Sequence, residues 1–183
     1  MDILVLSGST RAESLNTRLA GLVADSLPGH DVRIDAGLAR LPFYDADVEA
    51  AAVPQEVSGL RAAVAGADVV VITSPEYNGT TPGVLVNALD WLSRPHGASA
   101  LIGKPVLALT AAPGPRGGTR ALAHLTALLG TIGARVVGGG LSVPRAGQRL
   151  TTEGLPELRA ELAPLLQAAL DLAAPADGAE TAA

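Results

Sequence analysis

The chain has 183 residues, 13 of them Lys or Arg and 18 Asp or Glu, and it contains no cysteine. The absence of cysteine excludes disulfides, thiolate catalysis and sulfur-ligated zinc, and a net charge of −5 argues against a nucleic-acid-binding surface. The acidic start "MDILVLSGSTR" is unlike a signal peptide, and no apolar run reaches the roughly 18 residues of a membrane span, so we expect a cytoplasmic protein without a membrane partner.

Five short apolar runs alternate with helical patterns along the chain. The strand-like runs are residues 3–6, 31–36, 68–73, 104–112 and 134–143. The helical patterns are residues 14–28, 53–67, 82–92 and 119–133, with a last helix within 152–174, while residues 37–52 resemble a loop. This alternation predicts an α/β fold, in which one doubly wound, five-stranded parallel sheet of order 2-1-3-4-5 lies between two helical layers. We expect a single domain over residues 1–172 and a disordered tail over 173–183.

This strand order predicts where a ligand binds. Ligands of doubly wound sheets lie beyond the carboxyl ends of the strands, where the strand order reverses. The loops that follow the first, third and fourth strands meet at that edge, and they are residues 7–16, 74–83 and 112–121. These three segments are also the richest in Gly, Pro, hydroxyl and amide side chains, so we expect the functional site there.

The first loop has the composition of a phosphate-binding loop. It carries hydroxyl and amide side chains and one cation, Arg11, at the start of a helix whose unsatisfied N–H groups attract anions. It lacks the lysine of a P-loop and the G-x-G-x-x-G spacing of a dinucleotide site, which favours a terminal monophosphate. The alternative is that Ser14 only caps the helix and Arg11 is solvated.

The second and third loops suit a flat ligand. In "SPEYNG", Pro75 forces an extended residue before it, and Asn78 and Gly79 can take positive φ and turn their amides outward, toward the carbonyls of a planar heterocycle. The third loop, "APGPRGGTRA", is a Gly-Pro coil that a flat ligand can approach closely. The alternatives are an ordinary βα turn and a flexible connector.

Other candidate sites have weaker support. The three histidines show no metal-ligand spacing, and no G-x-S-x-G nucleophile elbow is present. Asp45 and Asp47 are interpreted as solvated loop acids, and Trp91 as a core residue or, second, as part of a subunit interface.

Three motifs together resemble one known family. "GSTRAESLNTRLA" is similar to the G-S-x-R-x-x-S-x-N signature of the NADPH-dependent FMN reductases, a flavodoxin-like family that includes quinone, azo and chromate reductases. "SPEYNGTTPGVLVNALDWLSRP" resembles the second signature of that family, and "LPFYDAD" resembles a further segment. The similarity covers roughly residues 1–145. Two features depart from the family pattern: Val86 stands where lysine is common, and the third loop is rich in proline.

The resemblance implies a cofactor site and no catalytic side chain. It assigns the FMN phosphate to Ser9, Arg11, Ser14, Asn16 and Thr17, the isoalloxazine ring to Pro75, Glu76, Tyr77, Asn78 and Gly79, and the other side of the ring to Arg116, Gly117 and Gly118. Because the flavin carries the chemistry, Tyr77 is expected only to shape the nicotinamide site, and no metal is expected.

The implied activity is NAD(P)H-dependent flavin oxidoreduction. Bound FMN would take hydride from NADPH, or NADH, and pass it by a ping-pong mechanism to a quinone, free flavin, azo compound or metal oxyanion. The resemblance also implies a homodimer or homotetramer, with the third helix and "DWLSRP" near the contact. The alternatives are a flavodoxin-type electron carrier without efficient direct NAD(P)H oxidation, and a family member that has lost its flavin.

Overall fold

Continuous apolar runs form the centre of a parallel sheet. A computed structural model describes residues 1–175, and in it β3 and β4 are buried at every position because helices cover both faces of the sheet. The strands are β1 (Asp2–Ser7), β2 (Asp31–Asp35), β3 (Val69–Ser74), β4 (Pro105–Ala111), β5 (Arg135–Val136) and β6 (Leu141–Val143). Their order is β2-β1-β3-β4-β5, all parallel, with β6 also paired to β4, so the predicted doubly wound order is confirmed.

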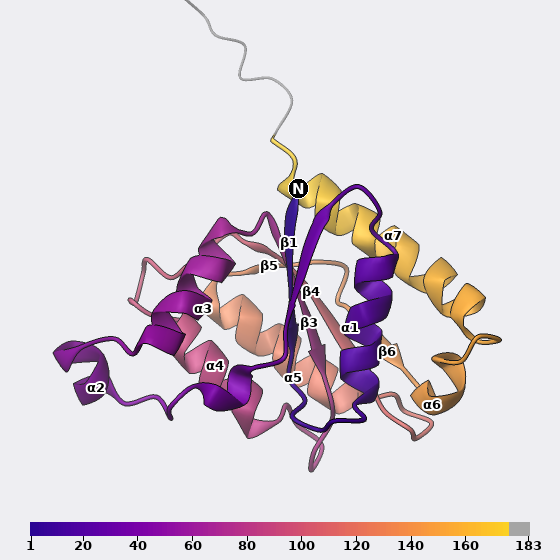
Figure 1. Ribbon diagram of the computed structural model, residues 1–183, viewed down its shortest axis with the longest axis horizontal. Helices are drawn as coiled ribbons and strands as arrows, with labels where there is room; N and C mark the ends of the chain where they lie inside the picture. The colour runs from indigo at the N-terminus through magenta and orange to yellow at the C-terminus, as the bar shows by residue number, and fades with distance from the viewer. Residues whose placement is uncertain (176–183) are drawn as a thin grey trace, which may run out of the picture.

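Helices lie on both faces of this sheet and complete the three layers (Figure 1). The helices are α1 (Leu15–Asp25), α2 (Ala46–Ala51), α3 (Gln55–Gly66), α4 (Gly83–Leu92), α5 (Thr119–Ile132), α6 (Ala146–Arg149) and α7 (Leu155–Ala173), with a 3-10 turn η1 at Leu38–Arg40. One apolar cluster joins α1 and α7 to the sheet through residues such as Val5 and Val71, and a second joins α3, α4 and α5 through Leu6 and Ile72. Alternate residues of one strand thus enter opposite cores.

The fifth strand differs from the prediction, because two short strands share its place. β5 pairs with the start of β4, at Pro105 and Val106, and β6 pairs with its end, at Leu109–Ala111. Between them, Gly138, Gly139 and Gly140 all have positive φ. A left-handed backbone cannot continue a β-ladder, so the predicted strand over 134–143 is interrupted in its middle.

The segment predicted as a loop, residues 37–52, contains η1 and α2. Asp45 is the N-cap of α2, since its carboxylate accepts hydrogen bonds from the backbone N–H groups of Asp47 and Val48 at 2.8 and 3.4 Å. Asp45 and Asp47 are both exposed, as predicted for solvated acids, but they belong to the start of a helix and not to a loop. The short α6 was also absent from the prediction.

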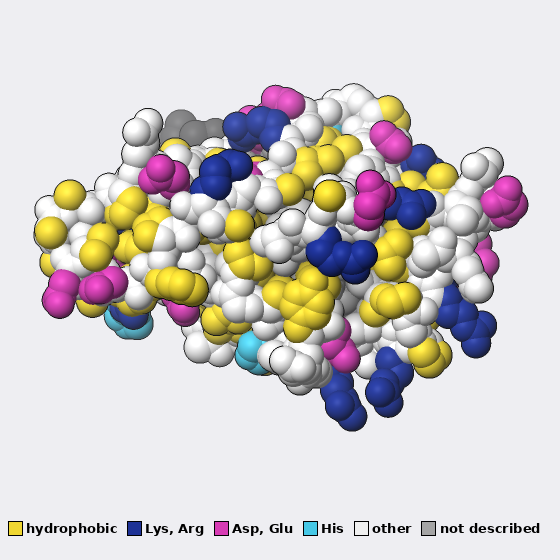
Figure 2. Space-filling model, turned by 60° about the horizontal axis from the view of Figure 1, so that its bottom comes forward, with side chains coloured by type: hydrophobic (Ala, Val, Ile, Leu, Met, Phe, Trp, Pro, Cys, Tyr) yellow, Lys and Arg dark blue, Asp and Glu magenta, His cyan; other side chains and the backbone are white. Residues whose placement is uncertain are grey.

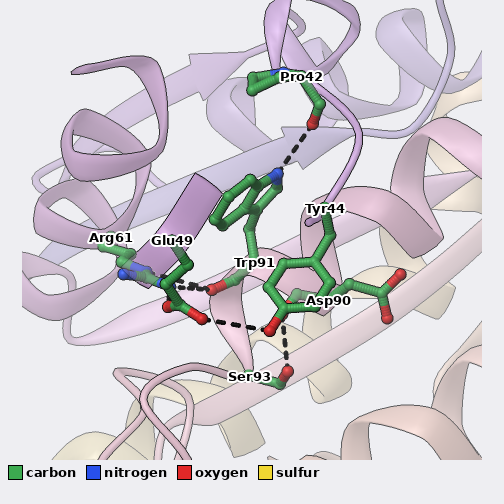
Figure 3. Close-up of polar contacts among 7 residues, drawn as sticks. All are labelled: Pro42, Tyr44, Glu49, Arg61, Asp90, Trp91 and Ser93. Atoms are coloured by element: carbon green, nitrogen blue, oxygen red, sulfur yellow. Dashed lines mark hydrogen bonds and ion pairs between the residues drawn. The ribbon is translucent and has the colours of Figure 1, made fainter. Parts of the chain in front are cut away.

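Trp91 is a core residue, as predicted, and it also holds the 37–52 segment in place (Figure 3). Its Nε1–H donates to the carbonyl of Pro42 at 2.8 Å, and its ring forms a T-shaped pair with that of Tyr44 at a centroid distance of 4.9 Å. Arg61 of α3 donates to the Trp91 carbonyl and pairs with Glu49 of α2 at 2.5 Å. The hydrogen bond from Arg61 holds the pKa of Glu49 below its usual range.

The carboxyl-terminal helix α7 ends at Ala173, the first residue of the predicted disordered tail. Residues 176–183 of that tail lie outside the described residues, so the single domain over 1–172 and the tail stay predictions. No helix within residues 1–175 is long and apolar enough to cross a membrane.

Candidate functional site

The three loops predicted to meet do lie together at the carboxyl edge of the sheet, the lower end of Figure 1. Register places Ser7 of β1 beside Thr73 of β3, and Ser74 of β3 beside Thr110 of β4. A cavity of about 230 Å³ at this edge takes lining residues from all three loops. They are Ser9, Arg11, Ser14, Leu15, Asn16, Pro75, Glu76, Tyr77, Ala111, Ala112 and Pro113.

The first loop offers hydrogen-bond donors at one end of this cavity. The Ser14 hydroxyl caps α1, because its oxygen accepts from the backbone N–H groups of Asn16 and Thr17, both at 3.1 Å. Its own proton is left free to donate into the cavity. Ser9 is buried beside it, and Arg11 is exposed, with no ion-pair partner among residues 1–175. Two hydroxyl groups, a guanidinium and a helix N-terminus form a donor set that fits a phosphate monoester.

Asn16 and Thr17 use their side chains to hold the loop. The Asn16 amide donates to the Ala111 carbonyl and accepts from the Ala111 N–H, both at 3.0 Å and both buried. The Thr17 hydroxyl pairs with that of Ser7 at 3.0 Å, and Thr17 does not line the cavity. Both residues therefore join α1 to the sheet.

The second loop is a two-residue β-hairpin turn. Tyr77 and Thr80 exchange backbone hydrogen bonds at 3.1 and 3.0 Å, and between them Asn78 and Gly79 have φ of 54° and 75°. Positive φ at both central residues defines a type I′ turn, for which Asn-Gly is the favoured pair. The predicted positive φ values are confirmed. The turn presents the ring of Tyr77, which is 47 % exposed, at the cavity.

This hairpin is anchored on α5 through side chains that the sequence did not indicate. The Glu76 carboxylate accepts from the backbone N–H groups of Arg120 and Ala121, both at 3.0 Å. The Thr80 hydroxyl lies 2.8 Å from Nδ1 of His124. Glu76 thus caps α5, whose own N-cap is a glycine without a side-chain acceptor. A glycine at the start of a predicted helix is therefore the sequence signal that could have indicated a capping side chain from another segment.

The first residues of the third loop line the cavity, and its later residues pack against other parts of the chain. Ala112 and Pro113 line the cavity, whereas the predicted Arg116, Gly117 and Gly118 do not. A Cβ atom on Gly117, which has φ of 63°, would lie 2.6 Å from the backbone nitrogen of Pro144. Gly117 is therefore needed for close packing against the end of β6, and a Cβ atom on Gly118 would lie 3.0 Å from the side chain of Thr110 in β4. Arg116 is exposed.

Basic side chains border the face that contains the cavity, although the whole chain is acidic. Figure 2 brings this face forward and shows arginine or lysine side chains along its lower and right-hand margin, around a hydrophobic patch. Such a margin attracts anionic ligands. Within the described residues, no group of three or more His, Asp or Glu side chains could hold a metal ion.

The family model and the similar proteins of known name agree on one family. The family model described as NADPH-dependent FMN reductase matches residues 1–148. A quinone reductase of Escherichia coli is 40% identical over 143 residues, which cover 75% of this chain and 73% of the relative. A quinone reductase of Pseudomonas putida is 37% identical over 117 residues, covering 64% of this chain and 63% of the relative, just under two thirds of its length.

A solved structure has the same fold. The flavoenzyme NAD(P)H:(acceptor) oxidoreductase FerB of Paracoccus denitrificans superposes with a TM-score of 0.78 at 24% sequence identity. The superposition covers 93% of this chain and 97% of that one, so the similarity extends over the whole three-layer architecture.

Proposed function

Because the chain belongs to the NADPH-dependent FMN reductase family, a family of oxidoreductases, we propose that it binds FMN and oxidises NADPH or NADH with a small-molecule acceptor. The observation that carries the proposal is the cavity of about 230 Å³ between the three loops. One end of it has donors for a phosphate and the other has flat, largely apolar walls. This division matches the two ends of FMN.

The phosphate end consists of the first loop. Ser9 and Ser14 would hold the phosphate through their hydroxyl groups, and Arg11 would supply the positive charge. The N-terminus of α1 adds its partial positive charge. Asn16 and Thr17 act by fixing the start of α1 to β4 and β1, which keeps these donors in place before the ligand arrives.

The ring end lies between the hairpin and the third loop. Pro75 and Tyr77 line this end from the hairpin, and Ala112 and Pro113 line it from the third loop. When bound, FMN supplies the hydride-accepting chemistry. The side chains around it orient the nicotinamide and exclude water, and Tyr77 acts as a wall for the nicotinamide and not as an acid or base.

A small quinone is the acceptor that we propose first. Support comes from the names of the Escherichia coli and Pseudomonas putida relatives, both quinone reductases. Free flavins, azo compounds and metal oxyanions remain acceptors to be compared with it. Because Tyr77 borders one exposed face of the cavity, reductant and acceptor would use that face in turn, which is a ping-pong mechanism.

The cavity does not favour an electron carrier. Carriers of the flavodoxin type commonly hold the ring between aromatic side chains, and Tyr77 is the single aromatic residue that lines this cavity among the described residues. A flavin ring without a second aromatic side chain against it would leave one face accessible to a nicotinamide.

A spectrum followed by turnover measurements tests the proposed function. We expect the purified chain to bind one FMN and to oxidise NADPH or NADH with benzoquinone, an azo dye or free FMN as acceptor. Initial rates against both substrates should give the parallel double-reciprocal lines of a ping-pong mechanism. A protein that fails to bind FMN in excess, or that binds it but oxidises neither nucleotide with any acceptor, would overturn the proposal.

We also propose a cytoplasmic homodimer or homotetramer. Phe43 is 86 % exposed and Val48 of α2 is 40 % exposed, in the segment that packs on the end of α4. Neighbouring exposed apolar side chains can form a patch of the kind that marks a subunit contact. Light scattering of the wild type and of Phe43→Ser should show a smaller assembly for the variant, whereas an unchanged mass would place the contact elsewhere.

A further inference from the structure

Arg145 has an unusual backbone conformation directly beside the third loop. It follows β6 with φ of 48° and ψ of 39°, and within residues 1–175 Asn78 is the other non-glycine residue with positive φ. Asn78 is in a turn that favours it, whereas an arginine gains nothing from this region of the map. Such conformations persist where neighbouring contacts impose them, and they occur often at functional sites.

Two backbone hydrogen bonds impose this conformation and join Arg145 to the candidate FMN site. The N–H of Arg145 donates to the carbonyl of Gly114, and that of Ala146 donates to the carbonyl of Ala112, both at 3.0 Å. In Figure 1 the third loop and α6 accordingly lie together at the lower right. The position of Arg145 is thus fixed by the same loop that lines the cofactor cavity.

Arg145 lines a second surface cleft that adjoins the first. This cleft has a volume of about 490 Å³ and is lined by Pro113, Pro115, Arg145, Gly147 and Gln148, all of them exposed. Pro113 also lines the cofactor cavity, so the two spaces meet at that residue. The volume falls within the range of sites that bind small organic ligands.

The lining of the cleft contains one cation and no acid, and Glu157 and Glu161 line a separate cleft on the other side of Arg145 and Gln148. Arg145 has no ion-pair partner within the described part of the chain, whereas the nearby Arg149 is paired with Glu161 at 2.6 Å. Gln148 adds an amide donor to the same lining. A free guanidinium with its planar fork of donors is well matched to a phosphate group.

We propose that Arg145 and Gln148 form a subsite for a phosphate of the adenosine half of the reducing nicotinamide dinucleotide. This inference rests on the proposed function, which places the nicotinamide in the cofactor cavity. The remaining half of the dinucleotide must leave that cavity, and the adjoining cleft past Pro113 provides both space and positive charge.

The variant Arg145→Gly tests the subsite without endangering the fold, since glycine adopts positive φ readily. Arg33→Ala is the matched control, because Arg33 is an exposed arginine on β2 that also has no ion-pair partner among residues 1–175. Calorimetry with adenosine 2′,5′-bisphosphate and with ADP measures nucleotide binding without turnover. KM and kcat for NADPH and NADH, with the FMN-loaded full chain, measure the same contact during catalysis.

We expect Arg145→Gly to raise KM about tenfold with kcat unchanged, and to weaken nucleotide binding by about the same factor, as for a lost charge-assisted hydrogen bond. A loss confined to NADPH and the 2′,5′-bisphosphate assigns the 2′-phosphate to the subsite. An equal loss for NADH and ADP assigns the diphosphate. The subsite proposal would be overturned if Arg145→Gly left KM for NADPH and NADH and the affinities for adenosine 2′,5′-bisphosphate and ADP unchanged. It would also be overturned if Arg33→Ala showed the same loss.

The two proposals fail separately. If the wild type binds adenosine 2′,5′-bisphosphate or ADP in a manner that depends on Arg145 but does not oxidise NADPH, the reductase function fails and the nucleotide subsite stands. If the wild type is an active reductase and Arg145→Gly matches it in every measurement, only the subsite fails.

Discussion

The loop after β1 and the hairpin after β3 border the same cavity, yet they use their polar groups differently. In the first loop, Ser9 and Arg11 have few or no protein partners, and the buried amide of Asn16 joins the loop to Ala111. In the hairpin, Glu76 and Thr80 are bonded to α5, and the ring of Tyr77 is what remains for a ligand.

This difference separates residues that hold a ligand from residues that hold a loop. The proposed phosphate site needs free donors, and the first loop has them, while the buried side chain of Asn16 anchors the loop. A planar ring needs a wall in a fixed position, so the hairpin uses its polar side chains for anchoring. The substitutions below test that division, beginning with the largest expected effect.

Replacement of Asn16 should affect stability most. Asn16→Ala leaves the N–H and the carbonyl of Ala111 buried without partners, at an expected cost of about 3 kcal/mol in the free energy of unfolding. Urea denaturation measures it, with Thr10→Ala in the same loop as the control, because Thr10 is exposed and such changes are usually worth under about 0.5 kcal/mol. If Asn16→Ala kept its stability and lost FMN affinity, Asn16 would be a ligand and not an anchor.

Replacement of Arg11 should weaken FMN binding without changing the stability of the fold. Arg11→Ala removes an exposed, unpaired guanidinium, so we expect unchanged stability and FMN binding weaker by about 10- to 100-fold. Riboflavin, which has the ring but no phosphate, is the matched ligand, and its affinity should stay the same. Fluorescence titration of both ligands measures this. An equal loss for riboflavin would show that Arg11 contacts the ring end instead.

Replacement of Glu76 should lower the stability of the fold and have little effect on FMN binding. Glu76→Ala removes the acceptor for two N–H groups at the start of α5, which we expect to cost about 1.5 kcal/mol of stability. Glu76→Gln keeps one carbonyl acceptor and should lose less. Thermal unfolding of the two variants makes the comparison. If both unfolded like the wild type while FMN binding fell, the carboxylate would belong to the cofactor site.

The sequence predicted the features that depend on local pattern. The β-branched run at 68–73 indicated a doubly buried strand, and the order of five βα units located the edge where the loops meet. Asn78 and Gly79 indicated positive φ because few other residues tolerate it. Each of these conclusions needs only neighbouring residues or a general rule of topology.

The sequence could not show which polar side chains already have partners. Asn16 bonds to a residue 95 positions away and Glu76 to one 44 away, and both side chains would suit a ligand equally well. Pro113 was within a loop predicted to approach the ligand, but only the folded chain shows that it joins two cavities. The conformation of Arg145 has no sequence signal, because an opposing backbone imposes it.

The smallest expected effect concerns the turn that carries Tyr77. Gly79→Ala places a side chain on a residue with φ of 75°, at an expected cost of about 1 kcal/mol in stability, whereas Asn78→Gly suits the turn and should be nearly neutral. Because the type I′ geometry sets the direction of the Tyr77 wall, Gly79→Ala should also raise KM for NADPH. FMN affinity, which we propose to depend mainly on the first loop, should change less. Steady-state kinetics and FMN titration on the same preparations separate the two effects. A loss of FMN affinity without a change in KM would mean that the hairpin supports only the flavin ring and does not form a wall for the nicotinamide.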